Sequence, residues 1–366
     1  MKLDMAWFLK CIRSFIKCMF VYALAWTGSL RRAERHIRHA GGVVTLTFHR
    51  VLDDASYGAT NSLPGIIIRE RTFQQLVRYV VKNYEPVAFG QVSPGDPSRR
   101  LRMAFTFDDG WRDSFTTAFP IIAACKVPVT LFICPGVLGK TTPFWPEQAM
   151  ALLRTARPQR DKDCFSENIE SLKRNSDDRE RYLAELKKHT PKAARTSPVD
   201  MTLSWDEIVK MHEAGICFGS HTDTHQILTS IPTSVARTEM SHSKAILEQV
   251  LGTSCVTFAY PNGNSSPFSL RTAKELGFTR AVTTERGIWT SSCDPLTIPR
   301  MNVCESGVVG VTGKFWPPMF KYTVLWKAWR AYRTTTLNRR SKTIAHIKGP
   351  SSDHMSPVDT RDSLSN

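Results

Sequence analysis

The sequence lacks the closely spaced cysteine pairs that bind zinc or build a disulfide framework. Its nine cysteines are an odd number, are scattered along 366 residues, and include no CxxC pair. Reduced and mostly buried thiols are the simplest interpretation. They favour a domain on the cytosolic side of a membrane.

Acidic residues are scarce in two segments that flank the middle of the chain, residues 1–40 and 314–348. The formal net charge is +16: residues 1–40 carry +6, residues 314–348 carry +9, residues 41–313 carry only +3, and the tail at 349–366 carries −2. A nucleic-acid enzyme usually has its positive charge around the active domain, so we expect no nucleic-acid partner. Hydrophobic residues make up 42% of the chain, which excludes wholesale disorder. We predict a catalytic domain at 41–313 and a disordered Ser/Asp/Pro-rich tail at 349–366.

No long hydrophobic run marks the N-terminus as a membrane span. The uncharged run at residues 18–30 gives about 20 Å of helix, against a hydrocarbon core of roughly 30 Å. Apolar residues instead surround a basic stripe made by Lys10, Arg13 and Lys17. We therefore predict that residues 1–40 associate with an anionic membrane surface, at its cytoplasmic face. The alternative is export by a secretory signal, cleaved or uncleaved, with a small-residue site at 23–25.

The second basic segment, residues 314–348, is predicted to be an amphipathic helix. One helical face carries mainly aromatic residues, namely Tyr322, Leu325, Trp326, Trp329 and Tyr332. Such a face suits the lipid headgroup layer, but it equally suits packing against the domain.

Short apolar runs alternate with helical stretches through the middle of the chain, which predicts parallel strands and an α/β fold. The predicted strands are residues 43–48, 103–107, 129–133, 216–219, 255–259 and 280–283. One helix begins at Thr72, and another follows Ser204, with Glu207 completing a capping box and Gly215 ending the helix. Residues 140–200 are polar and contain no strand-like run, so we predict a helical insertion there.

Polar residues follow three of these predicted strands. Asp108 and Asp109 end the second one, and such strand ends form binding crevices in α/β domains. Adjacent carboxylates repel each other unless a bound cation offsets their charge or the two groups have different partners and roles. His221 and His225 can reach one ion from a single turn of helix or tight loop. One Asp with these two His makes a three-ligand site with open positions, as in catalytic metal centres, and His49 would face the same mouth.

The strings TFDDG at 106–110, HTDTH at 221–225 and FAYPNG at 258–263, in that order, resemble the polysaccharide deacetylases. This family is also called carbohydrate esterase family four or the nodulation-factor deacetylase homology domain. The resemblance covers roughly residues 43–305. It implies a distorted (β/α) barrel with fewer strands than the eight-fold one, here with a helical insertion and flanking amphipathic helices. It also implies removal of acetyl groups from N-acetylated sugars.

The resemblance assigns site residues as well. Asp109, His221 and His225 would bind one divalent metal ion, zinc by default, although cobalt, nickel or iron also suit these ligands. Asp108 would be the general base for a metal-bound water nucleophile. Tyr260 and Pro261 would lie beside the substrate. A backbone N–H near Tyr260 would help the metal to stabilise the oxyanion that forms during the reaction.

The sequence departs from the commoner family pattern in two places. Many members have Arg at the position of Ala259 and a His in the last motif, where this chain has Arg300. FAYP-type members, which resemble the poly-N-acetylglucosamine deacetylases, share these features. On that likeness we expect His49 to be the general acid and Arg300 to steady Asp108. A structural role for His49, and a structural or substrate-carboxylate contact for Arg300, are the alternatives.

We therefore expect a hydrolase of non-peptide carbon–nitrogen bonds, a metal-dependent N-deacetylase of the cell envelope. Its substrate would be an amino-sugar polymer or a lipid-linked saccharide at the membrane surface. Deacylation of a non-sugar amide is an alternative, because the metal site hydrolyses the bond whereas the surrounding cleft determines which substrate binds. A catalytically silent saccharide-binding or scaffold protein is a further alternative, against which the presence of both Asp108 and Asp109 argues. The insertion could roof the substrate groove or meet a partner.

Overall fold

The computed structural model describes residues 5–335, except 96–97, 142–143, 157–164, 166–168, 170, 174–175 and 192–196. For residues 5–10 and 176–177 it describes only the backbone. The predicted tail at 349–366, and the predicted helix beyond residue 335, lie outside the described residues.

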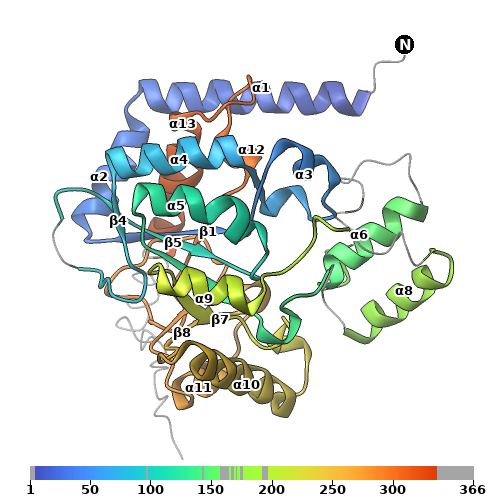
Figure 1. Ribbon diagram of the computed structural model, residues 1–366. Coiled ribbons are helices and arrows are strands. Elements are labelled where there is room, and N and C mark those ends of the chain that lie inside the picture. Colours follow the sequence, from blue (N-terminus) through green and yellow to red (C-terminus); the bar gives the residue numbers. More distant parts are fainter. Residues whose placement is uncertain are drawn as a thin grey trace, which may run out of the picture.

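A curled parallel sheet occupies the centre of the molecule (Figure 1). Its strands follow the order β10-β1-β5-β6-β7-β8-β9, and β4 also pairs with β5. The strands are β1 (Val43–Phe48), β4 (Glu85–Val87), β5 (Arg102–Phe107), β6 (Val129–Ile133), β7 (Cys217–Ser220), β8 (Thr257–Ala259), β9 (Arg280–Val282) and β10 (Met301–Asn302). With helices outside the sheet, this is the predicted distorted (β/α) barrel, and the six predicted strands are confirmed. A separate pair, β2 (Arg50–Leu52) and β3 (Ile67–Arg69), lies beside it.

The strand register decides which residues meet at the carboxyl edge of the sheet. Every residue of β1, β5 and β6 is buried, as expected for parallel strands covered on both faces. Phe48 pairs with Phe107, so the residues that follow β1 and β5 emerge side by side. Ser220 pairs with both Ile133 and Phe258, which brings the ends of β7 and β8 to the same edge.

Helices pack around the outside of the sheet. The longer ones are α4 (Glu70–Asn83), α5 (Phe119–Cys125), α9 (Trp205–Glu213), α10 (Thr233–Leu251) and α11 (Pro267–Glu275). Helix α9 begins with the predicted capping box, because the Ser204 side chain accepts from the backbone N–H of Glu207, whose carboxylate accepts from Ser204 N–H. Gly215, just after this helix, has a φ of 92°, which favours glycine. Short helices α3 (Asp54–Ala59) and α12 (Glu305–Val308) complete this part.

The insertion between β6 and β7 stands at one side of the barrel (Figure 1). Its described residues include α6 (Trp145–Ala156) and α8 (Ser176–Lys188) and no strand, in agreement with the prediction. It has a small hydrophobic core of its own, made by Ala149, Met150, Leu152, Leu153, Phe165, Ile169 and Leu183. The insertion therefore keeps its shape by packing within itself as well as against the barrel.

The N-terminal helices and the C-terminal helical segment pack against each other and on the domain. Helix α1 (Met5–Trp26) crosses the top of the molecule in Figure 1, and α2 (Ser29–His39) follows it down one side. At the other end, α13 (Pro317–Phe320) leads into a π-helical segment, Lys321–Trp326, and a helix at 327–335. Leu325 is fully buried, and Trp329 stacks on His36 with ring centroids 5.6 Å apart. Within the described residues the aromatic face of this helix thus packs on the domain. None of the described helices is long and apolar enough to cross a membrane.

Candidate active site

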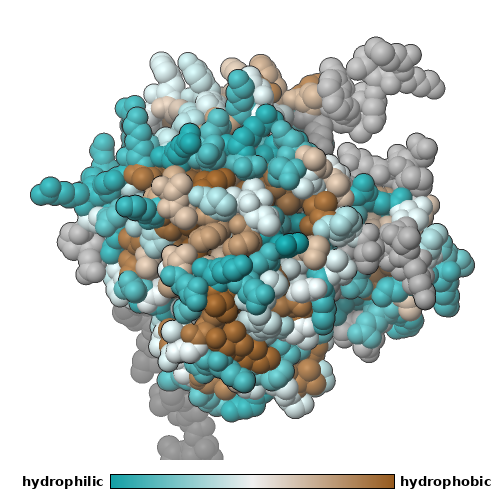
Figure 2. Space-filling model, viewed as in Figure 1, coloured by the Kyte–Doolittle hydropathy of each residue, from teal (hydrophilic) through white to brown (hydrophobic). Residues whose placement is uncertain are grey.

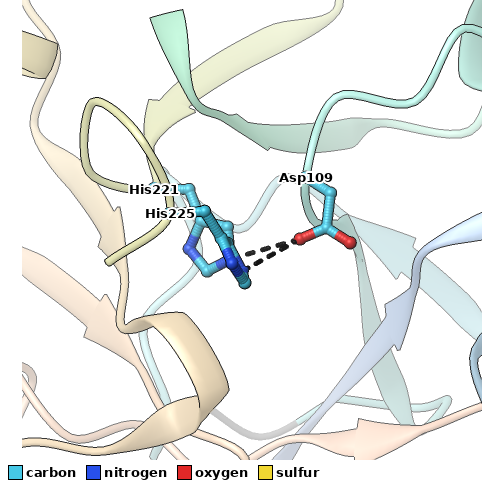
Figure 3. Close-up of side chains that lie close together, drawn as sticks. All are labelled: Asp109, His221 and His225. Carbon is cyan, nitrogen blue, oxygen red and sulfur yellow. Dashed lines mark ion pairs between the residues drawn. The ribbon is translucent and has the colours of Figure 1, made fainter. Parts of the chain in front are cut away.

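Three side chains from two strand ends converge on one point. Asp109 follows β5, whereas His221 and His225 lie in the loop after β7, and Figure 3 shows both imidazoles pointing toward the carboxylate. Asp109 Oδ1 lies 3.3 Å from His225 Nε2 and 3.5 Å from His221 Nε2. The structure therefore brings together the three residues for which a metal-binding role is predicted.

Unusual backbone conformations turn these side chains inward. Asp109 has a φ of 75° and His225 a φ of 63°, and Thr222 between the two histidines has a φ of 64°. Non-glycine residues rarely adopt such angles, and each costs of order 1–3 kcal/mol unless the surroundings impose it. Gly110 follows with a φ of 78°, where a Cβ would lie 3.0 Å from Ile133. The strain is concentrated where the loop geometry must aim the predicted ligands.

Hydrogen bonds behind the three side chains fix their orientation. Trp111 Nε1 donates to Asp109 Oδ2 at 3.0 Å, which leaves Oδ1 facing the histidines. His221 Nδ1 lies 2.7 Å from the carbonyl oxygen of Ala259, which holds the proton on Nδ1 and leaves Nε2 as the donor atom for a metal. Burial alone would raise the pKa of Asp109, but hydrogen bonds with both histidines hold it well below its ordinary value.

The donor set fits a divalent cation. All three donor atoms lie within 4.8 Å of one another. Bonds of about 2.0–2.1 Å in a tetrahedral zinc site separate neighbouring donor atoms by about 3.3–3.4 Å, close to the distances from Asp109 Oδ1 to the two imidazoles. Two imidazoles and one carboxylate suit zinc and also other first-row metals. Three protein ligands leave at least one position for water or substrate, as in catalytic sites.

A buried ion pair adjoins this cluster. Asp108 accepts two hydrogen bonds from Arg300, from Nη1 to Oδ1 at 2.7 Å and from Nη2 to Oδ2 at 2.6 Å, and both side chains are at least 97% buried. Arg300 is itself fixed, because its Nε donates to the carbonyl oxygen of Thr283. Burial raises the pKa of Asp108, but the charge and hydrogen bonds of Arg300, together with the nearby histidines, lower it below its ordinary value, so the carboxylate is ionised at neutral pH. Arg300 thus has the contact with Asp108 that the sequence predicts.

His49 faces the same carboxylate from the end of β1. Its Nε2 lies 3.9 Å from Asp108 Oδ2, beyond hydrogen-bond distance. Burial lowers the pKa of His49 despite the nearby aspartates, so the imidazole is neutral before substrate binds. Its Nδ1 is buried and has no hydrogen-bond partner among the described residues.

Tyr260 and Pro261 occupy the other predicted position, after β8. The backbone N–H of Tyr260 donates to the carbonyl oxygen of Val282 in β9, so it is already engaged in strand pairing. The Tyr260 ring is fully buried and lines the cavity over the cluster, and its buried hydroxyl has no partner within the described part of the chain. Pro261 is buried in the following turn and does not line that cavity.

The insertion closes the site from above. The cluster lies in a cavity of about 330 Å³, whose barrel side is formed by the strand ends. The facing side comes from the insertion and its leading edge, namely Phe144, Trp145, Pro146, Glu147, Ile169 and Lys173. The Phe144 ring lies 5.1 Å from the His225 ring. None of these residues was predicted from the sequence, where the aromatic pair Phe144–Trp145 inside an otherwise polar segment is the signal that could have indicated them.

Glu147 is the most unusual of these residues. It lies in the first turn of α6, is only 3% exposed, and its Oε1 accepts a hydrogen bond from the Ser62 hydroxyl at 2.9 Å. Burial raises the pKa of Glu147 to about 8, with a smaller contribution from the charge of Asp109. A carboxyl group that is neutral at pH 7 can donate a hydrogen bond to a ligand in the cavity.

A buried arginine ties the insertion to the barrel. Arg50 follows His49, and its guanidinium donates to Asp113 Oδ2 at 2.9 Å and to Asp200 Oδ1 at 2.5 Å. It also stacks over Trp111, with 4.2 Å from Cζ to the ring centroid. Asp200 lies at the end of the insertion, whereas Trp111 holds the predicted ligand after β5. Arg50 therefore couples the position of the insertion to the cluster of Asp109, His221 and His225, a role for Arg50 that was not predicted from the sequence.

Comparisons with known proteins agree with this geometry. No curated protein matches the chain. Among solved structures, the Streptococcus pyogenes deacetylase PplD, in complex with acetate, is 18% identical, with a TM-score of 0.52 over 77% of this chain and 98% of that one. The polysaccharide deacetylase BC0361 from Bacillus cereus is also 18% identical, with a TM-score of 0.50 over 77% of this chain and 69% of its own. These likenesses show a shared fold. The family model of polysaccharide deacetylases matches residues 96–281, half of the chain, and the protein therefore belongs to the polysaccharide deacetylase family, hydrolases of non-peptide carbon–nitrogen bonds.

Proposed function

We propose that the protein is a metal-dependent N-deacetylase, which removes acetyl groups from amino sugars of a polysaccharide or of a lipid-linked saccharide. The observation that carries this proposal is the pairing of two adjacent carboxylates with different partners. Asp109 faces two imidazoles, whereas Asp108 faces Arg300 and takes no part in the donor set. A metal-binding module without activity would not need an ionised, positioned carboxylate beside its ligands.

Asp109, His221 and His225 would hold the divalent cation. A bound cation supplies Lewis-acid chemistry, that is, polarisation of the acetyl carbonyl group and acidification of water. Asp108 accepts the proton of the attacking water, and Arg300 keeps this carboxylate ionised and aimed by its two hydrogen bonds. The bond between the carbonyl carbon and the sugar nitrogen then breaks, and acetate and a free amine form.

His49 lies on the route by which the proton reaches the leaving nitrogen. Its Nε2 is 3.9 Å from Asp108 Oδ2. Burial lowers the pKa of His49, so the imidazole is neutral before the reaction and, once it has taken the proton from Asp108, releases it readily to the leaving nitrogen. Trp145 and Glu147 would contact the sugar from the roof, the first by stacking on its apolar face and the second by a hydrogen bond. This would hold the acetyl group over the cluster and restrict access of water.

Acetate release from N-acetylglucosamine oligomers, measured with and without added zinc or cobalt, tests the proposal. Asp108→Asn and His221→Ala should each lower the rate by at least 10²-fold. Asp206→Asn and His39→Ala, at exposed positions that do not line the cavity, are matched controls that should retain the wild-type rate. Chelation should abolish activity, and metal addition should restore it.

Three outcomes are distinguishable. Metal-dependent acetate release that both site variants lose supports the reaction and the two residue roles. Absence of acetate, with one metal still bound per chain, shifts the substrate to a lipid-linked saccharide or another amide. Absence of both acetate and bound metal overturns the proposal.

A further inference from the structure

Helix α1 turns a continuous row of large apolar side chains to solvent. Ile12, Phe15, Ile16, Met19, Tyr22 and Trp26 form this row, which we call the α1 face. Their spacing of three and four residues places them along one side of the helix. Phe15, Ile16 and Tyr22 are about 60% exposed, and Trp26 is 82% exposed.

The opposite side of α1 holds the helix to the domain. Cys18 and Val21 are buried against Met319, and Lys17 Nζ donates to the carbonyl oxygen of Ser306 at 3.0 Å. The α1 face is therefore not a core surface that a small rotation of the helix would bury. Tan and brown residues at the upper edge of Figure 2, over α1, show part of this apolar surface.

The apolar surface continues beyond the helix. Val311, in the loop beside α1, is 62% exposed. Between α1 and residues 310–316 lies a hollow of about 320 Å³, lined mainly by apolar groups of Phe15, Met19, Phe315 and Trp316. Contiguous exposed apolar surface of this kind marks an interaction site.

Exposed basic side chains lie on α1 itself and on α2, which follows it. Arg13 is exposed on α1, and α2, which follows directly, exposes Arg31, Arg32, Arg35 and Arg38. A second hollow, of about 340 Å³, is lined by Arg31, Arg35, Arg38, Arg99, Arg100 and Lys321, with Glu34 as its single acid. Glu34 is paired with Lys321 at 2.8 Å. The hollow thus has a large excess of positive charge, which is complementary to phosphate groups.

We propose that an anionic lipid bilayer is the partner of the α1 face. The helix lies in the plane of the interface, with its apolar row at the boundary of headgroups and acyl chains and the arginines of α2 against lipid phosphates. Tyr22 and Trp26 are the side-chain types that favour this layer. This proposal does not depend on the proposed catalytic function.

Flotation of the full chain with lipid vesicles tests the docking surface. We expect binding to phosphatidylcholine vesicles that contain phosphatidylglycerol, and much weaker binding to phosphatidylcholine alone or at high salt. The double variant Ile16→Asp/Met19→Asp should weaken binding at least tenfold. The matched control Val235→Asp/Val250→Asp, at exposed valines of α10, should bind as the wild type does. The variant Arg31→Glu/Arg35→Glu should weaken binding at low salt and flatten the salt dependence.

Sedimentation equilibrium and circular dichroism complete the test. All variants should have the wild-type far-ultraviolet spectrum, because every substituted side chain is exposed. The proposal is overturned by a wild-type protein that fails to bind anionic vesicles at low salt. It is also overturned if Ile16→Asp/Met19→Asp binds anionic vesicles as tightly as the wild type does. A third contrary outcome is a wild-type dimer that Ile16→Asp/Met19→Asp converts to monomers, with no vesicle binding by either protein. In that last case a second copy of the chain covers the α1 face.

Discussion

Glu147 should make the protein less stable as the pH rises, whereas most carboxylates make a folded protein less stable as the pH falls. Its Oε1 accepts from Ser62 in a nearly closed environment, and burial raises its pKa to about 8. In the unfolded chain the same group titrates near 4.5. The native state therefore binds one proton more than the unfolded state between these two values. The stability that this proton contributes is complete below about pH 4.5 and is lost as the pH rises through about 8.

The size of the effect follows from the difference between the two pKa values. Each pKa unit corresponds to about 1.4 kcal/mol, so the free energy of unfolding should fall by roughly 3–5 kcal/mol between about pH 4.5 and 8.5 through this group alone. Glu147→Gln keeps the acceptor for Ser62 and removes the titration. Its stability relative to wild type should therefore rise by about that amount over the same pH range.

Urea denaturation of the metal-free wild type and Glu147→Gln at several pH values measures the difference. Glu213→Gln, at an exposed glutamate that ends α9, is the matched control and should show no such trend. A bound divalent cation near Asp109 opposes protonation of Glu147, so zinc should move the midpoint of the trend to lower pH. A stability difference between wild type and Glu147→Gln that stays the same from pH 5 to 8.5 would refute the burial of this carboxyl group.

Two further substitutions test the groups around the predicted metal. Arg300→Met leaves the charge of Asp108 buried without its partner, so urea denaturation should show a loss of about 3–5 kcal/mol in the free energy of unfolding. Acetate release should fall by at least 10²-fold, and Arg300→Lys should be intermediate in both measurements. A Met variant with wild-type activity would contradict the role of Arg300. Trp111→Phe keeps an aromatic ring over Arg50 but removes the hydrogen bond to Asp109. A competition titration should therefore show a metal affinity about 10–100-fold weaker than that of the wild type. An unchanged affinity would exclude the orientation of Asp109 by Trp111.

The sequence predicted the strand ends of the site because the relevant information is local. Hydrophobic runs mark where the strands end, and parallel pairing brings those ends to one edge, so His49 and Asp108 could be placed together before the register was known. The capping box at Ser204 is equally local, since both partners lie within four residues. The positive φ values of Asp109 and His225 were not predicted, because Asp and His at these positions carry no glycine-like signal.

The roof of the cavity could not be predicted, because it depends on long-range packing. The hydrogen bond that anchors Glu147 comes from Ser62, 85 residues earlier, and the one from Arg50 to Asp200 spans 150 residues. Composition identified the insertion as helical, but nothing local indicates that it folds back over the strand ends. For the N-terminal helix, the pattern gave a basic stripe through Lys17, whereas the structure turns Lys17 toward the domain and the apolar row outward, because packing against Met319 selects the face.

The neck of the insertion has a consequence for how relatives of this protein can diverge. Thr141 and Met201 form a bridge there, and the Lys140 N–H donates to the Thr202 hydroxyl, so the chain leaves and re-enters the barrel at one point. Sequence changes between these residues that leave Asp200 and its contact with Arg50 in place should alter the cavity without shifting the strands that carry the predicted ligands. Because the entropy of closing a loop grows only slowly with its length, whole helices can be gained or lost there at small cost. Exchange of the segment between residues 141 and 201 is therefore a simple way in which relatives with the same hydrolytic site could come to bind different substrates.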